Sequence, residues 1–327
     1  MTDSIGTIRV EVRRTAADAA AELRGDVRAG LTVHPKALSP KWFYDERGSA
    51  LFEQITQLPE YFATRAEQAL LEECAAEVAA LSGADTIVEL GSGSSRKTRT
   101  LLDAFTAVGT LRRYVPLDVS ESALRAALDA LAVDYPGLVL HGVVGDFTRH
   151  LDWLPRGGRR MVAFLGGTIG NLLPAERLDF LTRLWSVLAP GEQLLLGTGG
   201  VVDPGLLVPA YNDTAGVTAE FNRNVLRVLN RELHADFDVA AFEHVALWDP
   251  VQEWIEMRLR ARRAMTVTVA DLGLRVDFAA DEELRTEVSA KFRPARVREE
   301  LRITGFEPER TWIDPHGRVA LTLATAL

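Results

Sequence analysis

The sequence has 327 residues and a mass of 35.9 kDa, which at roughly 150 residues per domain predicts about two domains. Hydrophobic residues make up 47% of the chain and charged residues 25%, which disfavours disordered, collagen-like and low-complexity chains. The net charge of −9 disfavours nucleic acid as a partner, and the single cysteine, Cys74, excludes an internal disulfide and a cysteine-cluster metal site.

The first helix is expected over residues 12–30, which are rich in alanine. An aromatic cluster, Trp42-Phe43-Tyr44, then precedes a short helix predicted over residues 50–58. Thr64 and Glu67 have the spacing of a capping box, so a longer helix should begin there and end near residue 83.

Between residues 85 and 199, short apolar strands alternate with helices of about a dozen residues. Strands are predicted over residues 86–90, 114–118, 138–144, 161–165 and 194–196, and helices up to residue 105 and over residues 121–131 and 174–188. This alternation predicts an α/β fold with a doubly wound, mostly parallel, Rossmann-like sheet.

The alternation stops near Gly199. Residues 199–286 are interpreted as an insertion with a long amphipathic helix at 215–236 and strands at 243–248 and 254–260. We expect residues 1–60 and 199–286 to form a second, substrate-binding lobe, and residues 61–198 and 287–327 to form the sheet domain. A helix from Pro294 to Gly305 and strands at 309–313 and 319–324 predict an antiparallel hairpin at the end of the sheet.

The turn Gly91-Ser92-Gly93 follows the strand over residues 86–90 and precedes a helix, as in nucleotide-binding loops. A dinucleotide fingerprint needs a third glycine or alanine where this chain has Arg96, which disfavours an NAD-dependent dehydrogenase. With Asp118 and Asp146-Phe147 after the next two strands, the pattern favours an adenosine ligand. Asp118 would accept hydrogen bonds from the ribose hydroxyls and Asp146 from the adenine amino group.

These features resemble the class I S-adenosylmethionine-dependent methyltransferases. From about residue 20 to the end, the chain is similar to the L-histidine Nα-methyltransferases of ergothioneine biosynthesis. The resemblance rests on five segments: Pro40-Lys41-Trp42-Phe43-Tyr44-Asp45, Leu58-Pro59-Glu60-Tyr61-Phe62-Ala63-Thr64-Arg65, Phe164-Leu165-Gly166-Gly167-Thr168-Ile169-Gly170-Asn171, Phe221-Asn222-Arg223-Asn224 and Glu287-Val288-Ser289-Ala290-Lys291-Phe292. It implies trimethylation of the histidine α-amine to hercynine, with S-adenosylmethionine released as S-adenosylhomocysteine.

The resemblance also implies the site residues. Its cofactor positions fall on Gly91, Lys97, Asp118, Asp146 and Phe147. Its amino-acid positions fall on Tyr61, Asn171, Tyr211, Glu287 and Ser289, of which the first three would be catalytic. Two departures from the family pattern stand out: Gly167, where a serine is usual, and Gly199-Gly200 in the stretch Gly199-Gly200-Val201-Val202, where relatives tend to place an acid and a lysine.

Methyl transfer from a sulfonium requires orientation of a neutral amine and no metal, and the six histidines show no metal-ligand spacing. Tyr44 and Phe52 are candidates to hold a quaternary product by cation–π attraction. Glu287 and Ser289 could bind the two imidazole nitrogens if the chain there is extended, so a helix expected from near Asp281 should end or distort by Glu287.

Other functions are weighed against this one. A methyltransferase for another amino acid or amine would differ at Glu287 and Ser289, and a cofactor-binding protein without turnover would bind but not transfer. A hydrolase is disfavoured because Gly166-Gly167-Thr168-Ile169-Gly170 is not followed at once by a helix. Residues 1–14 lack the apolar core of a signal peptide and the apolar stretch 194–210 is interrupted, so we expect a cytoplasmic monomer without a membrane span.

Overall fold

The computed structural model describes residues 8–93, 95 and 97–327, and the chain divides into two compact units. The first, the sheet unit, comprises the chain up to Arg14 with Ala63–Val201 and Phe292–Leu327. The second unit comprises Thr15–Phe62 and Val202–Lys291. These bounds differ from the predicted ones at four places: residues 8–14 and 199–201 belong to the sheet unit, and residues 61–62 and 287–291 to the second unit.

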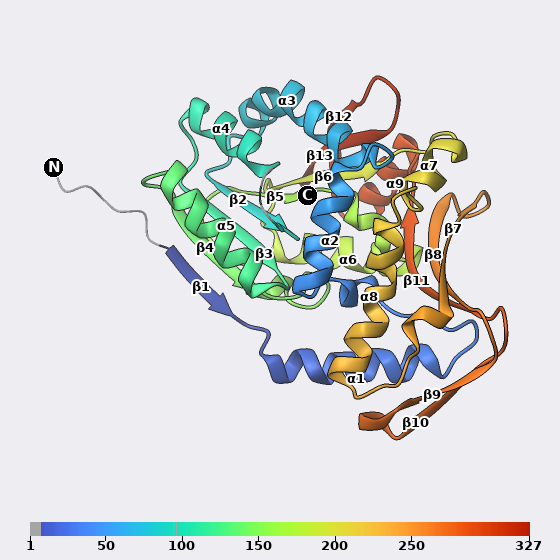
Figure 1. Cartoon of the computed structure of the whole chain (residues 1–327). Coiled ribbons are helices and arrows are strands. Elements are labelled where there is room, and N and C mark those ends of the chain that lie inside the picture. The colour runs from blue at the N-terminus through green and yellow to red at the C-terminus, as the bar shows by residue number, and fades with distance from the viewer. Residues whose placement is uncertain (1–7, 94, 96) are drawn as a thin grey trace. The chain divides into compact units, whose positions relative to one another are not determined.

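The sheet unit is built on one eight-stranded sheet (Figure 1). Seven strands run in one direction and β13 runs against them, in the order β1 (Ile8–Val12), β4 (Val139–Val144), β3 (Arg113–Asp118), β2 (Thr86–Leu90), β5 (Arg160–Phe164), β6 (Gln193–Gly199), β13 (Val319–Ala326) and β12 (Phe306–Ile313). The predicted mostly parallel α/β sheet with an antiparallel C-terminal hairpin is therefore confirmed. The strand β1, which the sequence did not indicate, extends the sheet by pairing with β4.

The chain reverses direction across the sheet between β2 and β5. From β2 the chain adds β3 and β4 on one side, and β5 and β6 extend the sheet on the other. In open α/β sheets such a reversal opens a crevice at the carboxyl ends of the strands, where ligands bind. The topology therefore points to the turns that follow β2, β3, β4 and β5.

Helices connect the strands of the sheet unit. They are α3 (Phe62–Ser82), α4 (Thr98–Val108), α5 (Glu121–Asp134), α6 (Pro174–Val187) and α9 (Pro294–Ile303), with short 3-10 turns η2 (Leu151–Trp153) and η3 (Thr168–Asn171). Ser120 caps α5 by accepting from the Ala123 N–H, and Pro174 occupies the first turn of α6.

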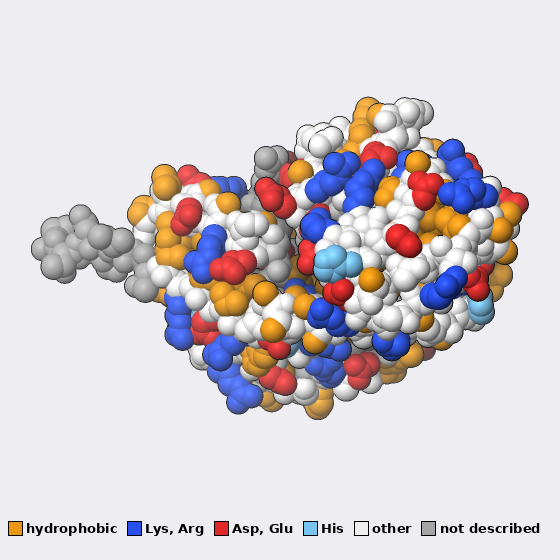
Figure 2. All heavy atoms as spheres, turned by 60° about the horizontal axis from the view of Figure 1, so that its bottom comes forward, with side chains coloured by type: hydrophobic (Ala, Val, Ile, Leu, Met, Phe, Trp, Pro, Cys, Tyr) orange, Lys and Arg blue, Asp and Glu red, His pale blue; other side chains and the backbone are white. Residues whose placement is uncertain are grey.

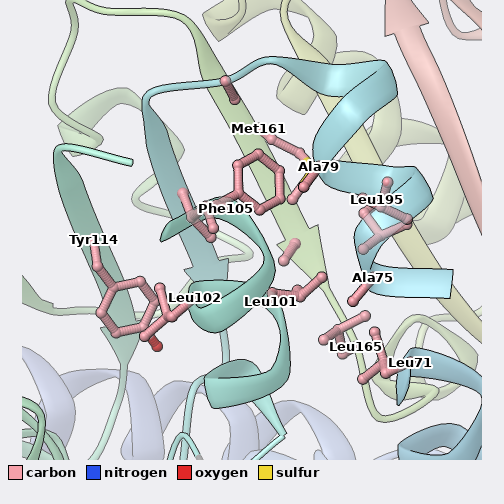
Figure 3. Packing of buried hydrophobic residues seen from close by; sticks show 14 of the residues in the cluster. Leu71, Ala75, Ala79, Leu101, Leu102, Phe105, Tyr114, Met161, Leu165 and Leu195 are labelled. Carbon is pink, nitrogen blue, oxygen red and sulfur yellow. The ribbon is translucent and has the colours of Figure 1, made fainter. Parts of the chain in front are cut away.

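The core of the sheet unit lies between these helices and the strands (Figure 3). Apolar side chains from α3 and α4 face those of β5, β6 and the turn after β5; they include Leu71, Ala75, Ala79, Leu101, Leu102, Phe105, Met161, Leu165 and Leu195. Each fully buried leucine or phenylalanine contributes about 1.5–3 kcal/mol of transfer free energy. This packing fixes the strand ends that carry the candidate site.

One predicted helix start is wrong. The helix α3 begins at Phe62, so Thr64 lies inside its first turn and cannot cap it with Glu67. Glu67 is buried, and its carboxylate accepts hydrogen bonds from the Gly166 N–H at 2.8 and 3.0 Å. Glu67 has the spacing of a capping-box residue relative to Thr64, but its hydrogen-bond partner is Gly166, 99 positions away.

The second unit combines helices with two small antiparallel sheets. Its helices are α1 (Ala16–Leu31), α2 (Glu46–Gln57), α7 (Pro204–Ala210) and α8 (Val217–Glu232), with 3-10 turns η1 (Pro40–Phe43), η4 (Val239–Ala241) and η5 (Ala270–Leu272). One sheet has the order β11 (Glu283–Ala290), β8 (Trp254–Ala261), β7 (Phe242–Asp249), and the other pairs β9 (Met265–Val269) with β10 (Leu274–Phe278).

The helix α8 organises the core of the second unit. Its apolar face buries Phe221, Val225 and Leu229 and packs against α2 and β7. Its polar residues Asn222 and Asn224 are completely buried and bind backbone groups instead of water: Asn222 Nδ2 donates to the Arg258 carbonyl at 3.0 Å and Asn224 Nδ2 to the Phe43 carbonyl at 3.2 Å. The Phe221–Asn224 segment thus ties separate parts of the unit together.

The helix expected from near Asp281 is absent, and the strand β11 takes its place. Leu284 and Thr286 are buried between half-buried neighbours, and from Val288 to Ala290 every residue is buried. The neighbouring strand β8 pairs with β11 and overrides the local helical propensity. The strands β9 and β10 were also not predicted.

Candidate active site

The turn after β2 brings the backbone close to the position where a ligand would lie. Gly91 has a φ of +70°, a conformation that glycine adopts without steric cost, and its N–H donates to the Leu117 carbonyl of β3 at 2.8 Å. A Cβ built on Gly91 would stand 3.8 Å from the Phe147 ring. Gly91 and Phe147, both predicted to bind the cofactor, are therefore neighbours.

Asp118 ends β3 beside this turn. Its carboxylate accepts the Gly93 N–H at 2.8 Å and the Ser120 N–H at 2.9 Å. Burial raises the pKa of Asp118 above its ordinary value of 3.8, and the N–H groups of Ser120 and Gly93 offset part of that rise. An ionised carboxylate can accept about four hydrogen bonds, so Asp118 keeps capacity for a ligand hydroxyl beside the N–H groups of Gly93, Ser120 and Val119.

Asp146 and Phe147 follow β4. Asp146 is buried, and its Oδ1 accepts the N–H and the hydroxyl of Thr148 at 2.8 and 2.6 Å. These two hydrogen bonds stabilise the turn that follows β4. The Phe147 ring packs edge-on against Phe164 and Phe180, with ring centroids 5.0 and 5.8 Å apart. The turn is thereby held rigidly at the sheet edge.

Lys97 precedes α4 and lies near the turn after β5, and its cofactor role stays a prediction. Its ammonium forms an ion pair with Glu67 and stands 3.6 Å from a Cβ built on Gly166, in the turn after β5. Glu67 in turn accepts the Gly166 N–H. Sequence analysis missed Glu67 as a site residue because its local spacing suggested a helix cap.

A second buried carboxylate, Glu89, lies in β2 just before the glycine turn. It lies within β2, accepts the Thr98 hydroxyl at 2.6 Å and binds the Tyr114 hydroxyl, which is 3.0 Å from Ser95 Oγ. Burial raises the pKa of Glu89 to about 7, because its hydroxyl partners and the more distant Lys97 only partly stabilise the charge. The position just before the glycine turn was the signal that could have identified it.

Asn171 also belongs to the sheet unit. It closes the 3-10 turn η3 between β5 and α6, and it is half-buried. The turn is held by the Gly170 N–H, which donates to the Gly167 carbonyl at 2.9 Å. Asn171 therefore follows the same sheet edge as the cofactor positions.

The two family departures lie in this unit as well. Gly167 precedes η3 with a φ of +67°. At Gly200 a Cβ would stand 1.8 Å from the Gly317 carbonyl oxygen, so no side chain fits beside the β12–β13 turn. The Gly200 N–H donates to the Arg318 carbonyl at 2.8 Å, and this close approach anchors the end of β6.

In the second unit, aromatic rings gather around Tyr61. Its ring centroid lies 6.2 Å from that of Phe52 and 6.2 Å from that of Tyr211, both in edge-on geometry. Tyr44 and Phe221 continue the cluster, with Tyr44 5.6 Å from Phe52. Tyr44 and Phe52, the predicted aromatic wall, therefore adjoin the predicted catalytic tyrosines.

Tyr211 and Ser289 are brought together across 78 positions of sequence. Their hydroxyl oxygens are 2.7 Å apart, and Lys291 Nζ donates to Tyr211 Oη at 2.9 Å and to Ser289 Oγ at 2.8 Å. Ser289 and Lys291 are both buried. Lys291 lies within the Glu287–Phe292 segment, but the sequence pattern did not single it out.

Glu287 and Ser289 share one face of β11, since residues two apart in a strand point the same way. A bulge between Arg285 and Glu287 shifts the register of β11 on β8. Such bulges re-aim side chains. The extended chain that imidazole recognition requires is present, although it arises from a strand and not from a distorted helix.

The structure also bears on metal sites, membrane spans and surface charge. In the described residues, no group of three or more His, Cys, Asp or Glu side chains could hold a metal ion, and no helix has the length and apolar character needed to span a membrane. Figure 2 shows lysine and arginine side chains interspersed with acidic ones on the face it displays.

The chain was compared with known proteins. A family model described as histidine-specific methyltransferase, SAM-dependent, matches residues 23–326. The chain is 58% identical over 310 residues to a histidine N-alpha-methyltransferase of Mycolicibacterium smegmatis, covering 94% of this chain and 97% of that protein. It is 37% identical over 202 residues to ergothioneine biosynthesis protein 1 of Neurospora crassa, covering 60% of this chain and 23% of that protein.

Among solved structures, the PH0226 protein from Pyrococcus horikoshii matches with a TM-score of 0.50 and 14% identity, covering 87% of this chain and all of that one. That likeness concerns the fold alone. The parallel sheet, the glycine turn after β2 and the acid that ends β3 define an S-adenosylmethionine-dependent methyltransferase with a Rossmann-like sheet. More narrowly, the chain belongs to the family of histidine-specific, S-adenosylmethionine-dependent methyltransferases.

Proposed function

We propose that this protein transfers up to three methyl groups from S-adenosylmethionine to the α-amine of L-histidine, giving hercynine in the first step of ergothioneine biosynthesis. The observation that carries the proposal is the likeness over nearly the whole chain to a histidine N-alpha-methyltransferase, with Glu287 and Ser289 on one strand face. The likeness to ergothioneine biosynthesis protein 1 supports the pathway step.

The residues of the sheet unit fit the cofactor. The carboxylate of Asp118 would accept the ribose hydroxyls, Asp146 the adenine amino group, and the Gly91 turn would let the backbone approach. Lys97 is held by Glu67 at the reversal of the sheet, where ligands bind in this kind of fold. When bound, S-adenosylmethionine supplies an electrophilic methyl group on a sulfonium.

The residues proposed to bind the amine and the carboxylate of histidine have uncharged side chains. Tyr61, Tyr211 and Asn171 offer hydroxyl and amide groups that donate and accept hydrogen bonds without adding charge. They can hold the carboxylate and the amine of histidine while the amine is neutral. Orientation of this kind can contribute about 7–11 kcal/mol to a displacement in favourable cases.

The same residues suit a product that becomes a permanent cation. After three methylations the amine no longer donates a hydrogen bond, and aromatic faces attract a quaternary ammonium. Tyr44 and Phe52 adjoin Tyr61 in the aromatic cluster of the second unit. We assign them to the trimethylated nitrogen.

Glu287 and Ser289 are assigned to the imidazole ring. A carboxylate accepts from the ring N–H, and a hydroxyl can serve the other ring nitrogen. An apolar amino acid would leave Glu287 desolvated without a partner from the ligand, which disfavours its binding. A methyltransferase for another amine would lack this selectivity.

The test is mass spectrometry of the purified protein incubated with S-adenosylmethionine and the twenty common amino acids. A gain of three methyl groups on histidine alone is expected, and Asp118→Asn serves as the control for cofactor-dependent transfer. Methylation of a different amino acid would replace histidine as the substrate, and cofactor binding without any transfer would indicate a non-catalytic protein. A cytoplasmic location, a monomeric state and the lack of a nucleic-acid partner remain predictions, to be checked by fractionation, light scattering and gel shift.

A further inference from the structure

Lys291 occupies an unusual place in the second unit. Its side chain is nearly buried, with the residue 7% exposed, and its ammonium donates to two hydroxyl oxygens, Tyr211 Oη at 2.9 Å and Ser289 Oγ at 2.8 Å. Within the part of the chain that the structure describes, no carboxylate lies at ion-pair distance from it. A buried ammonium without a counter-ion is costly, so its position needs a reason.

A second buried lysine of the same unit shows the ordinary arrangement. Lys36 is 3% exposed, forms an ion pair with Glu282 and lies 4.8 Å from the centre of the Phe278 ring. Lys36 thus has a carboxylate partner that balances its charge. Among the described residues, the Lys291 ammonium instead contacts two hydroxyls and, at 4.9 Å, the Tyr211 ring.

The three groups form a closed triangle, since the two hydroxyl oxygens are 2.7 Å apart. Both hydroxyl oxygens accept from Lys291, and one hydroxyl must donate to the other. If Tyr211 donates to Ser289, both lone pairs of Ser289 are occupied and its proton is left to donate outward. If Ser289 donates instead, Tyr211 keeps the outward proton. In either case the triangle presents an O–H donor.

When Tyr211 donates to Ser289, the outward donor is Ser289, which stands beside an acceptor on the same strand. Glu287 and Ser289 share one face of β11, so a carboxylate and a donating hydroxyl lie next to each other. A neutral imidazole has one N–H and one lone pair, and this pair of groups complements both. An imidazolium, with two N–H groups and no lone pair, would face the hydroxyl with a donor.

The backbone of Tyr211 is fixed as well. The Tyr211 carbonyl is 2.8 Å from His244 Nε2, and His244 Nδ1 is 2.8 Å from Asn222 Nδ2. Because the amide of Asn222 donates, Nδ1 accepts and Nε2 carries the proton that it donates to Tyr211. Burial lowers the pKa of His244, which favours this neutral form.

We propose that Lys291 is a positioning residue for the imidazole of the substrate: its ammonium binds the Tyr211 and Ser289 hydroxyls and thereby orients Ser289 to donate to the ring lone pair while Glu287 accepts from the ring N–H. The inference rests on the proposed function. Lys291 does not touch the reacting amine; it acts through the two hydroxyls.

The test compares Lys291→Met with Lys291→Arg in the full-length protein. We expect Lys291→Met to raise the dissociation constant of histidine about 10- to 100-fold, because the hydroxyls lose their charged donor. The dissociation constant of S-adenosylhomocysteine should change less than about twofold, since its residues lie in the sheet unit. Lys291→Arg retains donors for both hydroxyls and should restore histidine binding to within about fivefold of the wild type.

Histamine, which has an imidazole but no carboxylate, separates two roles of the ammonium. Equal weakening of histidine and histamine by Lys291→Met supports orientation toward the ring. Weakening of histidine alone would mean that Lys291 holds the substrate carboxylate, and it would overturn the inference. Equal loss in the methionine and arginine variants would also overturn it.

Lys36→Met is the matched control, because it removes a buried ammonium from the same unit. It should lower the unfolding temperature and leave the histidine dissociation constant within twofold. If Lys291→Met does not fold, the test uses the arginine variant and the wild type. In the wild type, histamine methylated on either ring nitrogen should bind at least about tenfold more weakly than histamine, because each methyl group removes one ring hydrogen bond. Undiminished binding of both derivatives would contradict the donor–acceptor pair.

The proposed function and this inference fail in different ways. If the wild type neither binds nor methylates histidine, the proposed function is wrong. If the wild type methylates histidine and Lys291→Met binds it as tightly as the wild type, only the role of Lys291 is wrong.

Discussion

In the sheet unit, Gly91, Asp118 and Asp146 each follow the end of a strand, and parallel pairing of β2, β3 and β4 brings them to one edge. In the second unit, Tyr211 and Ser289 are 78 residues apart and meet through hydrogen bonds between α7 and β11. The first site is a consequence of topology. The second depends on tertiary contacts that no local pattern encodes.

Each unit also contains a buried ionisable side chain whose hydrogen-bond partners are hydroxyl groups, but the two side chains have different roles. Glu89, beneath the glycine turn, is a carboxylate held by hydroxyls, and Lys291 is an ammonium held by hydroxyls. The former supports a backbone turn, and the latter is proposed to orient side chains toward a ligand. Substitutions at the cofactor positions of the sheet unit should therefore affect the cofactor, and substitutions at Glu287, Ser289 and Lys291 should affect the amino acid.

The largest effect is expected for Asp118→Asn. Loss of a carboxylate that accepts two ribose hydroxyls should weaken S-adenosylhomocysteine binding at least about a hundredfold, because hydrogen bonds to charged groups contribute about 1.5–3 kcal/mol each. Histidine binding should change less than threefold. Calorimetric titration of both ligands measures this, with Asp134→Asn, a surface aspartate paired with Arg99, as the control. Unchanged cofactor affinity would remove Asp118 from the site.

The reverse selectivity is expected for Glu287→Ala. Histidine should bind about 30- to 100-fold more weakly, since the imidazole N–H loses a charged acceptor, while S-adenosylhomocysteine binding should stay within twofold. Glu283→Gln on the same strand, where the carboxylate accepts from Arg258 and Arg260, is the matched control for a general loss of β11. Comparable weakening of both ligands in Glu287→Ala would count against its assignment to imidazole.

A pH effect of about 2 kcal/mol is expected from Glu89. Its folded pKa of about 7 lies above its ordinary value of 4.5, so the folded state binds the proton more tightly than the unfolded state. Its contribution to stability is present below pH 4.5 and is lost as the pH rises through 7. Between pH 5 and 7 the free energy of unfolding should therefore fall by about 2 kcal/mol from this group.

Glu89→Gln should remove that slope, as measured by urea denaturation at several pH values. Glu192 is the control with the opposite sign: burial alone would raise its pKa, but hydrogen bonds from Arg160 and the Ala189 N–H more than offset it and lower the pKa. The contribution of Glu192 to stability is lost as the pH falls. An identical pH profile in wild type and Glu89→Gln would show that Glu89 is not protonated in the folded protein near neutrality.

The smallest effect is expected for Phe52→Leu. The aromatic face lost from the cluster with Tyr44 and Tyr61 should weaken hercynine binding about fivefold, an energy of about 1 kcal/mol, and histidine binding less. Competition by hercynine against histidine turnover measures the difference. Phe278→Leu, in the separate aromatic group with Phe237 and Phe242, should not discriminate between the two ligands. Equal weakening of histidine and hercynine by Phe52→Leu would indicate a packing role only.

Apart from β1, the strands of the sheet unit were predictable to within a few residues because each is a short apolar run between turn residues. The prediction of residues 86–90 coincides with β2, and Asp118 ends β3 as expected. The capping role of Glu67 was wrong, since a capping-box spacing says nothing about a distant N–H such as that of Gly166. The helix expected before Glu287 was wrong because pairing with β8 outweighs local propensity.

By itself, the sequence determined the α/β class and the positions of most parallel strands along the chain, because both depend on hydrophobic periodicity. It also determined the glycine turn and its two aspartates, because these residues directly follow strand ends. Only the tertiary structure decided that β1 joins the sheet, that Glu67 meets Lys97, and that Lys291 joins Tyr211 to Ser289. The physical reason is that a buried polar side chain must find its partner wherever the packed chain supplies one, and that partner leaves no trace in the local spacing.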